Sequence, residues 1–399
     1  MPSPRTRALI IISATLFLSA LVWYNYSAVL PLLVAEWELT GTRAGIIFGA
    51  FQAGYLFAIL PMGWLADRYS PRWIVSIGAT GTGLASIGFA LLAVGFWSGT
   101  GLRLLSGLFM AGVYVPGMRF LSDWYPPAQR GRAIGLYVGS FSVGSALSFL
   151  ATAAIADAVD WRTAIAATSV GVVAIAPLVL GLTRDHPDAV ERGTVGFDLS
   201  ILRNRAYLSA VSAYSWHNWE LLGARNWLLA FLLATPAFAT TGSGVLAGTV
   251  AAVWVAMSGV GNAFGGWASD RIGRGRTIAI GLLVSGSISA VLGFLGWLPV
   301  WLLVVLLVVY GVALSVDSAP SSTLVTEVVD DAQVGTALSI QSFVGFSTTV
   351  VSPVVFGLAL DVAGWGPAFA TLAVGALLGV ASIGALRYWA GSREPTGTT

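Results

Sequence analysis

The stretch GWLADRYSPR (residues 63–72) places one acid and two arginines between two long apolar runs of the chain. A near-copy, GWASDRIGRGR (266–276), stands in the same setting, and Asp270 follows Asp67 by 203 positions in a chain of 399 residues. A charged hinge that recurs at about half the chain length predicts an internal repeat. The nature of the apolar runs around it decides the fold class.

The composition indicates a membrane protein. Hydrophobic residues make up 56% of the chain and charged residues only 10%, with a mean hydropathy of +0.82, whereas a soluble domain carries roughly 25% charged residues. So few charges could not cover a water-facing surface, and we expect a lipid bilayer around the chain. The net charge of +2 gives no indication of nucleic acid, and the absence of cysteine excludes disulfides and thiolate metal sites.

Twelve apolar runs are long enough to cross a bilayer, which takes about 20 residues for a hydrocarbon core of roughly 30 Å. The first exceeds the length of a signal-peptide core and lacks a small-residue cleavage site, so we interpret it as a span. All twelve should be helices, because a backbone in lipid has to satisfy its own hydrogen bonds. The predicted spans are 8–33, 44–66, 73–95, 101–122, 132–154, 163–182, 206–234, 244–268, 277–297, 300–323, 335–358 and 366–389.

The positions of the arginines predict the orientation. With the N-terminus inside, only Arg43 and Arg162 fall on the outer side, and the arginines of the termini, the even-numbered loops and the linker lie inside. We therefore expect a multi-pass protein of the cell membrane with both termini in the cytoplasm. The longest polar break, 183–205, is interpreted as a cytoplasmic linker between an N-terminal half (1–182) and a C-terminal half (206–399).

Two further pairs of segments recur in the same order. RGRAIG (130–135) matches QVGTALS (333–339), and DAVDWRTAI (157–165) matches DVAGWGPAF (361–369), with an offset of 204 between Trp161 and Trp365. Repeats in this order predict two six-helix halves related by a parallel repeat. Secondary transporters are built in this way, with the substrate site near the midplane between the repeats.

The two hinges resemble the loop signature of the major facilitator superfamily, G-x-L-x-D-R-x-G-R-R/K. The first copy departs from that signature at Ser70 and Pro71, and Arg103-x-x-x-Gly107 and DWYPPAQRGRA (123–133) resemble two further motifs of the family. The resemblance implies an all-α integral membrane fold with twelve transmembrane helices in two pseudo-symmetric six-helix bundles. A fold alone indicates little about the substrate. The matching residues are Gly63, Leu65, Asp67, Arg68 and Arg72, and then Gly266, Asp270, Arg271, Gly273, Arg274 and Arg276.

In such a fold the halves rock about a central site, so the cytoplasmic loops must lock in one state and release in the other. We expect the Asp67 carboxylate to pair with a nearby arginine or with a helix N-terminus across the half interface. The alternative is that these charges only mark the cytoplasmic end, although topology gives no reason for the two aspartates. The predicted gating residues are Gly63, Asp67, Arg68, Arg72, Arg130, Arg132, Asp270, Arg271 and Arg274.

Charged residues inside the spans are costly and mark functional sites by default. They lie in the spans 101–122, 206–234 and 300–323, which the resemblance implies line the central cavity together with the first span. Aromatic and amide side chains accompany them in YSWHNWE (214–220) and WYNY (23–26), a composition that suits a small-ligand site. The five charged residues are Arg103, Arg119, Glu220, Arg225 and Asp317. The predicted substrate-binding residues are Asn25, Tyr26, Arg119, Trp216, Asn218 and Arg225.

Glu220 lies at mid-depth and is the first candidate for a proton-coupling group, followed by Asp317 and His217. Burial disfavours the charged form of the Glu220 carboxyl group, whereas a nearby Arg225 would favour that charged form. The alternatives are a Glu220–Arg225 pair that never titrates and a His217 that only hydrogen-bonds a neighbouring helix. Arg119 and Asp317 lie at nearly the same level, so we expect them to pair across the halves. Arg103, near the outer end of its span, either snorkels to the headgroups or belongs to the site.

These features favour a secondary active transporter. No phosphate-loop motif, H-E-x-x-H motif or Ser–His pairing indicates a pump or an intramembrane enzyme, and we expect no cofactor or metal. RDHPDAVERG (184–193) resembles a stretch found in organic-anion and carboxylate branches of the family, and three intramembrane arginines against two acids favour an anion. We expect a monomeric, proton-coupled, rocker-type transporter of a small organic anion. The alternatives are an exporter of amphiphilic compounds and a non-transporting receptor on the same fold.

Overall fold

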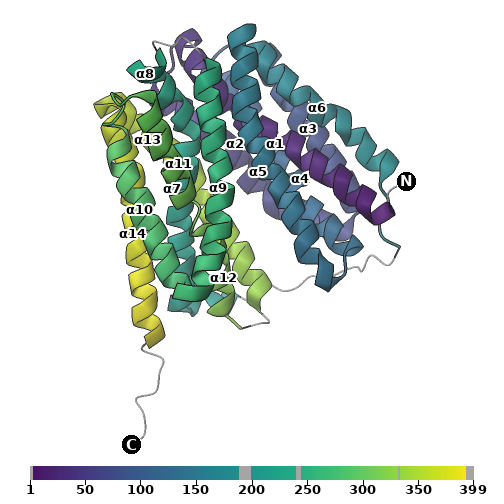
Figure 1. Cartoon of the computed structure of the whole chain (residues 1–399). Coiled ribbons are helices and arrows are strands. Elements are labelled where there is room, and N and C mark those ends of the chain that lie inside the picture. Colours follow the sequence, from purple (N-terminus) through teal and green to yellow (C-terminus); the bar gives the residue numbers. More distant parts are fainter. Residues whose placement is uncertain (1–2, 188–198, 240–243, 331–332, 392–399) are drawn as a thin grey trace, which may run out of the picture. The chain divides into compact units, whose positions relative to one another are not determined.

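The structure, a computed structural model, describes residues 3–187, 199–239, 244–330 and 333–391, which are helical nearly throughout and contain no strand (Figure 1). The first six helices are α1 (Pro4–Glu36), α2 (Gly41–Arg68), α3 (Pro71–Leu92), α4 (Phe96–Trp124), α5 (Pro127–Ala158) and α6 (Trp161–Leu182). The later elements are the 3₁₀ turn η1 (Leu199–Arg203), α7 (Arg205–Ala234), α8 (Pro236–Ala239), α9 (Gly244–Ile272), α10 (Arg274–Leu292), α11 (Val300–Ala313), α12 (Ser318–Glu327), α13 (Val334–Ala363) and α14 (Trp365–Gly391).

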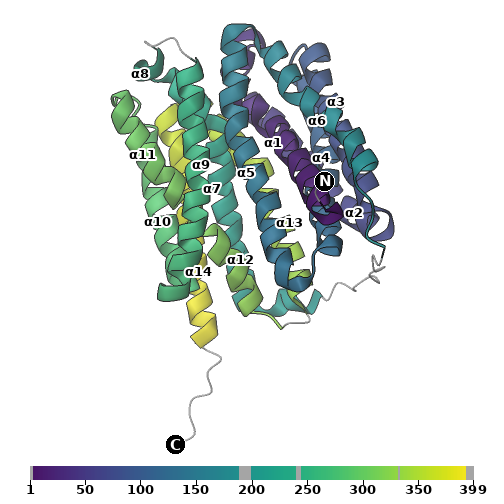
Figure 2. The ribbon, with the colours of Figure 1, turned by 45° about the vertical axis from the view of Figure 1, so that its right-hand side comes forward.

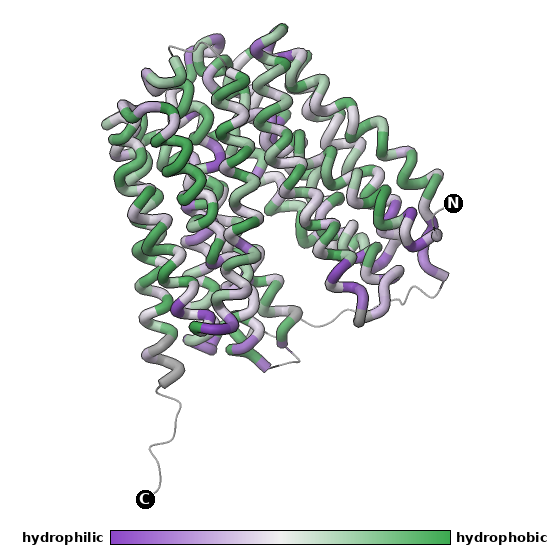
Figure 3. Tube along the Cα trace, in the orientation of Figure 1, coloured by the Kyte–Doolittle hydropathy of each residue, from purple (hydrophilic) through white to green (hydrophobic). Residues whose placement is uncertain are grey.

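The predicted membrane spans correspond to helices. Eleven segments of the described chain are long and apolar enough to cross a bilayer, with Val300–Glu327 counting as one. The remaining predicted span, α7, has 30 residues and contains the more polar sequence YSWHNWE. Figure 3 shows hydrophobic residues along the helix shafts and hydrophilic residues gathered at many of the helix ends. The all-α membrane fold is thereby confirmed.

One predicted span, 300–323, is in fact two helices, because the chain leaves the helical path at residues 314–317, between α11 and α12. The amides of Ser315, Val316 and Ser318 bond to carbonyls three residues earlier, which is the pattern of tight turns. Pro320 has no amide hydrogen for the Val316 carbonyl and crowds it, so a regular helix cannot continue through this point. The break places Asp317 at the N-cap position of α12.

The described chain divides into two compact units. The first contains α1–α6 with residues 228–234 and 238–256, and the second contains the rest. Inside the first unit α4 packs on α2 and α3, α1 on α5, and α3 on α6; inside the second, α10 packs on α14 (Figures 1 and 2). The sequence-based division at 183–205 stays a prediction, and residues 188–198 of that linker lie outside the described part.

Glycines let the helices approach closely in both units. A Cβ atom on Gly107 of α4 would lie 1.9 Å from the Phe51 carbonyl oxygen of α2. In the second unit, a Cβ atom on Gly265 of α9 would lie 1.8 Å from the Val316 carbonyl oxygen. Small residues at such contacts are the usual means of joining helices in lipid. The Gly265 contact also packs α9 directly against the break between α11 and α12.

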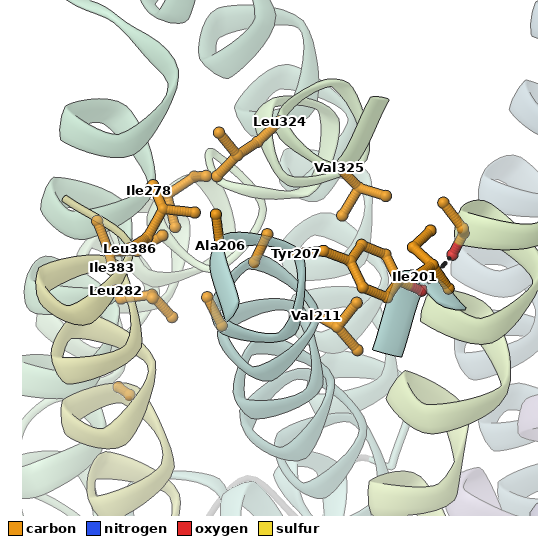
Figure 4. Close-up of a cluster of buried hydrophobic side chains, with 14 residues drawn as sticks. Ile201, Ala206, Tyr207, Val211, Ile278, Leu282, Leu324, Val325, Ile383 and Leu386 are labelled. Atoms are coloured by element: carbon orange, nitrogen blue, oxygen red, sulfur yellow. Dashed lines mark hydrogen bonds between the residues drawn. The ribbon is translucent and has the colours of Figure 1, made fainter. Parts of the chain in front are cut away.

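A hydrophobic cluster holds one end of the second unit together. Tyr207 and Val211 of α7 meet Ile278 of α10, Val325 of α12 and Leu386 of α14 there, all of them buried (Figure 4). The Tyr207 hydroxyl donates to the Ala337 carbonyl at 2.9 Å, so the ring is both buried and hydrogen-bonded. This cluster packs together turns of α7, α10, α12 and α14. Of these, α7, α10 and α12 also carry polar residues of the candidate site.

Candidate functional site

A buried acid–histidine pair lies at the break between α11 and α12. Nδ1 of His217, from α7, lies 2.8 Å from Oδ1 of Asp317, and both side chains are no more than 3% exposed. Nε2 of His217 lies 3.0 Å from the Ser318 hydroxyl, which fixes the second ring nitrogen. Although Oδ1 lies close to Nδ1, neither carboxylate oxygen of Asp317 has a hydrogen-bond partner among the described residues. The pair therefore has a polar atom in the protein interior that is not satisfied by protein groups.

A second buried carboxylate, Glu220, lies on α7 three residues after His217. Its two oxygens accept hydrogen bonds from Ser289 at 2.6 Å and from Ser285 at 2.8 Å, both on α10. The Ser289 hydroxyl also lies 2.8 Å from the Tyr310 hydroxyl of α11. Because hydroxyl groups can donate or accept, this network satisfies Glu220 in either protonation state. Arg225 lies on α7 five residues further on and is half-buried, and its predicted pairing with Glu220 stays a prediction.

The other predicted residues of α7 contact their own unit. The Asn218 amide donates to the Tyr214 carbonyl at 2.9 Å, and the Trp216 and Trp219 rings meet edge to face at 5.9 Å between centroids. Trp219 Nε1 also donates to the Thr371 carbonyl of α14 at 3.1 Å. Substrate binding by Trp216, Asn218 and Arg225 stays a prediction.

In the first unit, Asn25 and Tyr26 are engaged in packing. The Asn25 amide lies 3.3 Å from the Ser86 hydroxyl of α3 and within 3.5 Å of Ser169 of α6. The Tyr26 hydroxyl donates to the Ala44 carbonyl of α2 at 2.9 Å, and the side chain is fully buried. Both side chains are thus held inside the first unit, and substrate binding by Asn25 and Tyr26 stays a prediction.

Arg103 does not snorkel to the headgroups. Its side chain is buried, with 1% of the residue exposed, and its guanidinium donates to the Val22 and Trp23 carbonyls of α1 at 3.1 and 3.2 Å. The guanidinium carbon also lies 4.4 Å from the centre of the Phe51 ring and 5.3 Å from that of Tyr26. Backbone carbonyls and aromatic faces thus solvate the charge, and Arg103 joins α4 to α1 and α2.

The expected pairing of Arg119 with Asp317 is wrong, because each residue has other partners. Nε of Arg119 donates to Asp67 Oδ1 at 2.9 Å, and its Nη1 makes a very short contact with Asp123 one turn later on α4. Asp317 pairs with His217 instead. Arg119 therefore belongs with the charged end of α2. The predicted surplus of intramembrane arginines disappears with this assignment, since Arg103 and Arg225 then stand against Glu220 and Asp317.

The expected arginine partners of Asp67 are engaged elsewhere. Arg130 donates to the Ser122 carbonyl at the end of α4, at 3.0 Å, whereas Arg132 is exposed. Arg72 donates to the Thr183 carbonyl after α6 at 2.9 Å and pairs with Asp185 at 3.2 Å. Helix C-termini attract such cations. Arg68 stacks on the Trp64 ring at 5.0 Å, while Gly63 has room for a Cβ atom, with Val115 4.0 Å away.

The second hinge forms a comparable cluster in the other unit. Arg274 makes a very short contact with Asp270 and donates from Nε to Glu327 Oε1 at 3.1 Å. Arg271 stacks on the Trp267 ring at 3.9 Å, as Arg68 does on Trp64. The hinge charges are therefore held by contacts inside their own units, and their role in gating stays a prediction.

Several of these partners were not foreseen from the sequence. Ser285, Ser289 and Tyr310 resemble ordinary small or aromatic residues of an apolar span, so nothing marked them as partners of Glu220. Two signals were available: Asp123 follows Arg119 by four residues, the spacing of a helical ion pair, and Pro320 three residues after Asp317 indicates a helix interruption.

Comparison with known proteins identifies the family. The family model described as Major Facilitator Superfamily matches residues 12–245 and 221–399. A hexuronate transporter of Bacillus subtilis is 25% identical, with 94% of this chain and 93% of that protein covered. A phosphoglycerate transporter protein of Salmonella typhimurium is 23% identical, with 88% and 83% covered. A probable sulfoacetate transporter of Cupriavidus necator is 28% identical over about half of each chain, 52% and 48%.

Solved structures share the fold. The inward-facing, occupied structure of a bacterial homologue of the human lysosomal transporter Spinster aligns with a TM-score of 0.79 at 18% identity, covering 98% of this chain and 96% of the other. A mutant structure of a nucleoside transporter aligns with a TM-score of 0.81 at 14% identity, covering 96% and 99%. At such identities the likeness concerns the fold alone. The matched family model, the helical fold and the hinge repeat together show that this chain belongs to the Major Facilitator Superfamily.

Proposed function

We propose that this protein is a proton-coupled secondary transporter of a small organic anion, which works by alternating access in the cell membrane with both termini in the cytoplasm. The comparisons already show that the chain is a multi-pass member of a family of small-solute transporters and not an enzyme. The proposal adds the class of solute, the coupling ion, the location and the orientation.

The names of the relatives support an anionic solute. Hexuronates and sulfoacetate carry a carboxylate, and phosphoglycerate carries a carboxylate and a phosphate. The alignment with the hexuronate transporter extends over nearly the whole of both chains. We therefore take a sugar acid with one carboxylate as the first substrate to test. The intramembrane arginine count no longer supports this choice, because Arg119 is assigned to the hinge.

The observation that carries proton coupling is the His217–Asp317 pair. One proton held by either member makes this pair, whose Nδ1 and Oδ1 lie 2.8 Å apart, neutral overall, whereas its loss leaves one negative charge among buried groups. The neutral form suits a closed protein, and the charged form suits a pair in contact with water. Alternation between the two is what coupling requires. Two further titratable groups lie on the same helix as His217. They are Tyr214, whose ring centre is 6.2 Å from that of His217, and Glu220.

The break between α11 and α12 supports the same assignment. In transporters, interrupted helices near the midplane expose backbone polar groups and carry substrate or ion sites. Here the interruption presents Asp317 at the start of a new helix, with both carboxylate oxygens lacking a hydrogen-bond partner among the described residues. Glu220 has a complete set of serine partners and is therefore the second candidate.

Uptake by purified protein in liposomes tests the class of solute. D-glucuronate and D-glucose form a matched pair of probes, because they differ only in the carboxylate. With an imposed pH gradient, labelled glucuronate should accumulate and glucose should not. Equal uptake of both sugars, or uptake of neither while amphiphilic cations are transported, would contradict the anion assignment.

A further inference from the structure

The two units contain charged clusters of the same kind. In the first, Arg119 bridges Asp67 at the end of α2 and Asp123 near the end of α4. In the second, Arg274 bridges Asp270 near the end of α9 and Glu327 at the end of α12. In each cluster one guanidinium pairs with two carboxylates.

The carboxylates occupy equivalent positions in the repeat. Asp67 corresponds to Asp270 at an offset of 203, and Asp123 corresponds to Glu327 at 204. The second offset is supported along the same helix by two further pairs, Gly107 with Gly311 and Pro116 with Pro320. The register of the repeat therefore assigns both acids of one cluster to the acids of the other.

The arginines do not correspond. The position equivalent to Arg274 in the first half is Pro71, which has no charge, and the position equivalent to Arg119 in the second half is Thr323. The guanidinium of the second half comes from the first residue of α10, whereas that of the first half comes from the shaft of α4. The same ionic contact is thus made from two different places in the repeat.

The local backbone around this position differs between the two hinges. Gly273, with φ of +92°, turns the chain into Arg274, a conformation that glycine adopts without strain. Ser70 stands before a proline, which disfavours the helical region for it, and has φ of −56° and ψ of 117°. Pro71 then begins α3, and Ser70 and Arg72 both bind Asp185 after α6.

We infer that Arg119 is a positioning residue that replaces the missing hinge arginine at Pro71 and holds the Asp67 carboxylate against α4. The side chain of Arg119 is 11% exposed, compared with 23% for Arg274, so its contacts are better shielded from water. Taking the arginine from α4 instead of from the hinge also changes which helices the ion pairs connect. Arg274 connects α9, α10 and α12. Arg119 connects α2 and α4, and Arg72 joins the start of α3 to the residues after α6.

This assignment leads to a test by relocation of the charge. Arg119→Gln should lower the melting temperature of the purified protein, and Pro71→Arg on that background should restore it, because the second half shows that an arginine at this place reaches both acids. Pro71→Gln on the Arg119→Gln background is the matched control without charge. Restoration by glutamine as well as by arginine, or by neither, would overturn the inference.

The reciprocal experiment in the second half guards against a variant that fails to fold. Arg274→Gln should destabilise the protein, and Thr323→Arg should restore it by supplying the cation from α12, as Arg119 does from α4. If Thr323→Arg lowers the melting temperature further, the two clusters are not equivalent. These measurements need no substrate and are independent of the proposed function.

The effect on transport rests on the proposed function and on the predicted role of Asp67 in gating. Arg119→Gln should slow the exchange of D-glucuronate about twofold to thirtyfold, the range that corresponds to perturbing one two-state coupling, with little change in KM. Pro71→Arg should recover the rate. A rise in KM at unchanged maximal rate would instead mean that Arg119 binds substrate. Restored stability without restored exchange would retain the positioning role and remove Asp67 from the gate.

Discussion

Replacing Glu220 by alanine should destabilise the protein much more than replacing it by glutamine. Alanine removes two hydrogen bonds to serines, each worth about 0.6–1.7 kcal/mol inside a membrane protein, and leaves a cavity that adds about 2 kcal/mol or more at a fully buried site. The expected loss is about 3–5 kcal/mol. Glutamine keeps the volume and one acceptor, and the Ser285 and Ser289 hydroxyls can reverse toward its amide, so its cost should stay below about 1 kcal/mol.

Thermal unfolding in detergent, followed by the loss of the monodisperse peak on size-exclusion chromatography, measures the difference. Glu36→Ala serves as a control. Glu36 pairs with Arg162 at 3.1 Å, with both side chains more than a third exposed, and accepts a hydrogen bond from Trp161 Nε1. The surface pair contributes about 0–1 kcal/mol and the hydrogen bond about 0.5–1.5 kcal/mol, so the loss should stay below that of Glu220→Ala. If Glu220→Ala and Glu220→Gln unfold at the same temperature, or if neither differs from Glu36→Ala, then Glu220 does not bridge α7 and α10.

Three further predictions concern other parts of the structure. Gly265→Ala should destabilise the protein by about 1–3 kcal/mol or more, because its Cβ atom would meet the Val316 carbonyl, while Gly266→Ala, with nothing within 4 Å, should have little effect in the same melting assay. Arg103→Lys should cost about 1–3 kcal/mol, since one ammonium group cannot reproduce two guanidinium bonds to α1; a lysine variant as stable as the wild type would contradict this. The backbone amide and hydroxyl of Thr163 lower the pKa of Asp160 below its ordinary value of 3.8. The stabilisation that Asp160 provides is therefore complete above that value and is lost as pH falls through the lowered pKa; Asp160→Asn should flatten this acid dependence of melting, and an unchanged profile would refute it.

The fold followed from features that a single sequence displays well. Runs of about 20 apolar residues have one solution in lipid, the helix, so composition alone gave the spans. The repeat of Asp67 and Asp270, with the flanking glycine and arginines, indicated the family. The hinge cations were harder to pair, because Arg68 and Arg72 lie within five residues of Asp67. Only the fold shows that Arg72 and the more distant Arg130 bind helix ends.

The sequence identified the acidic residues of the candidate site but not the residues that bind them. A buried carboxylate is rare enough to be recognised from sequence, and Glu220 and Asp317 were both identified in this way. Serines are frequent in membrane helices, so Ser285 and Ser289 became visible only when α10 was placed beside α7. The Arg119–Asp317 expectation failed because depth along a span was used without the direction of the side chains. Arg119 extends toward Asp67 and Asp123, at the ends of α2 and α4.

Proton movement driven by substrate tests the central claim most directly. Liposomes that contain the purified protein and a trapped pH-sensitive dye are given D-glucuronate with no initial pH gradient, and the internal pH is recorded. Wild-type protein should change the internal pH with glucuronate and not with D-glucose, and Asp317→Asn should abolish that change while still exchanging labelled glucuronate between the two sides. Wild-type transport of glucuronate without any pH change, or an unaltered pH change in Asp317→Asn, would contradict the account.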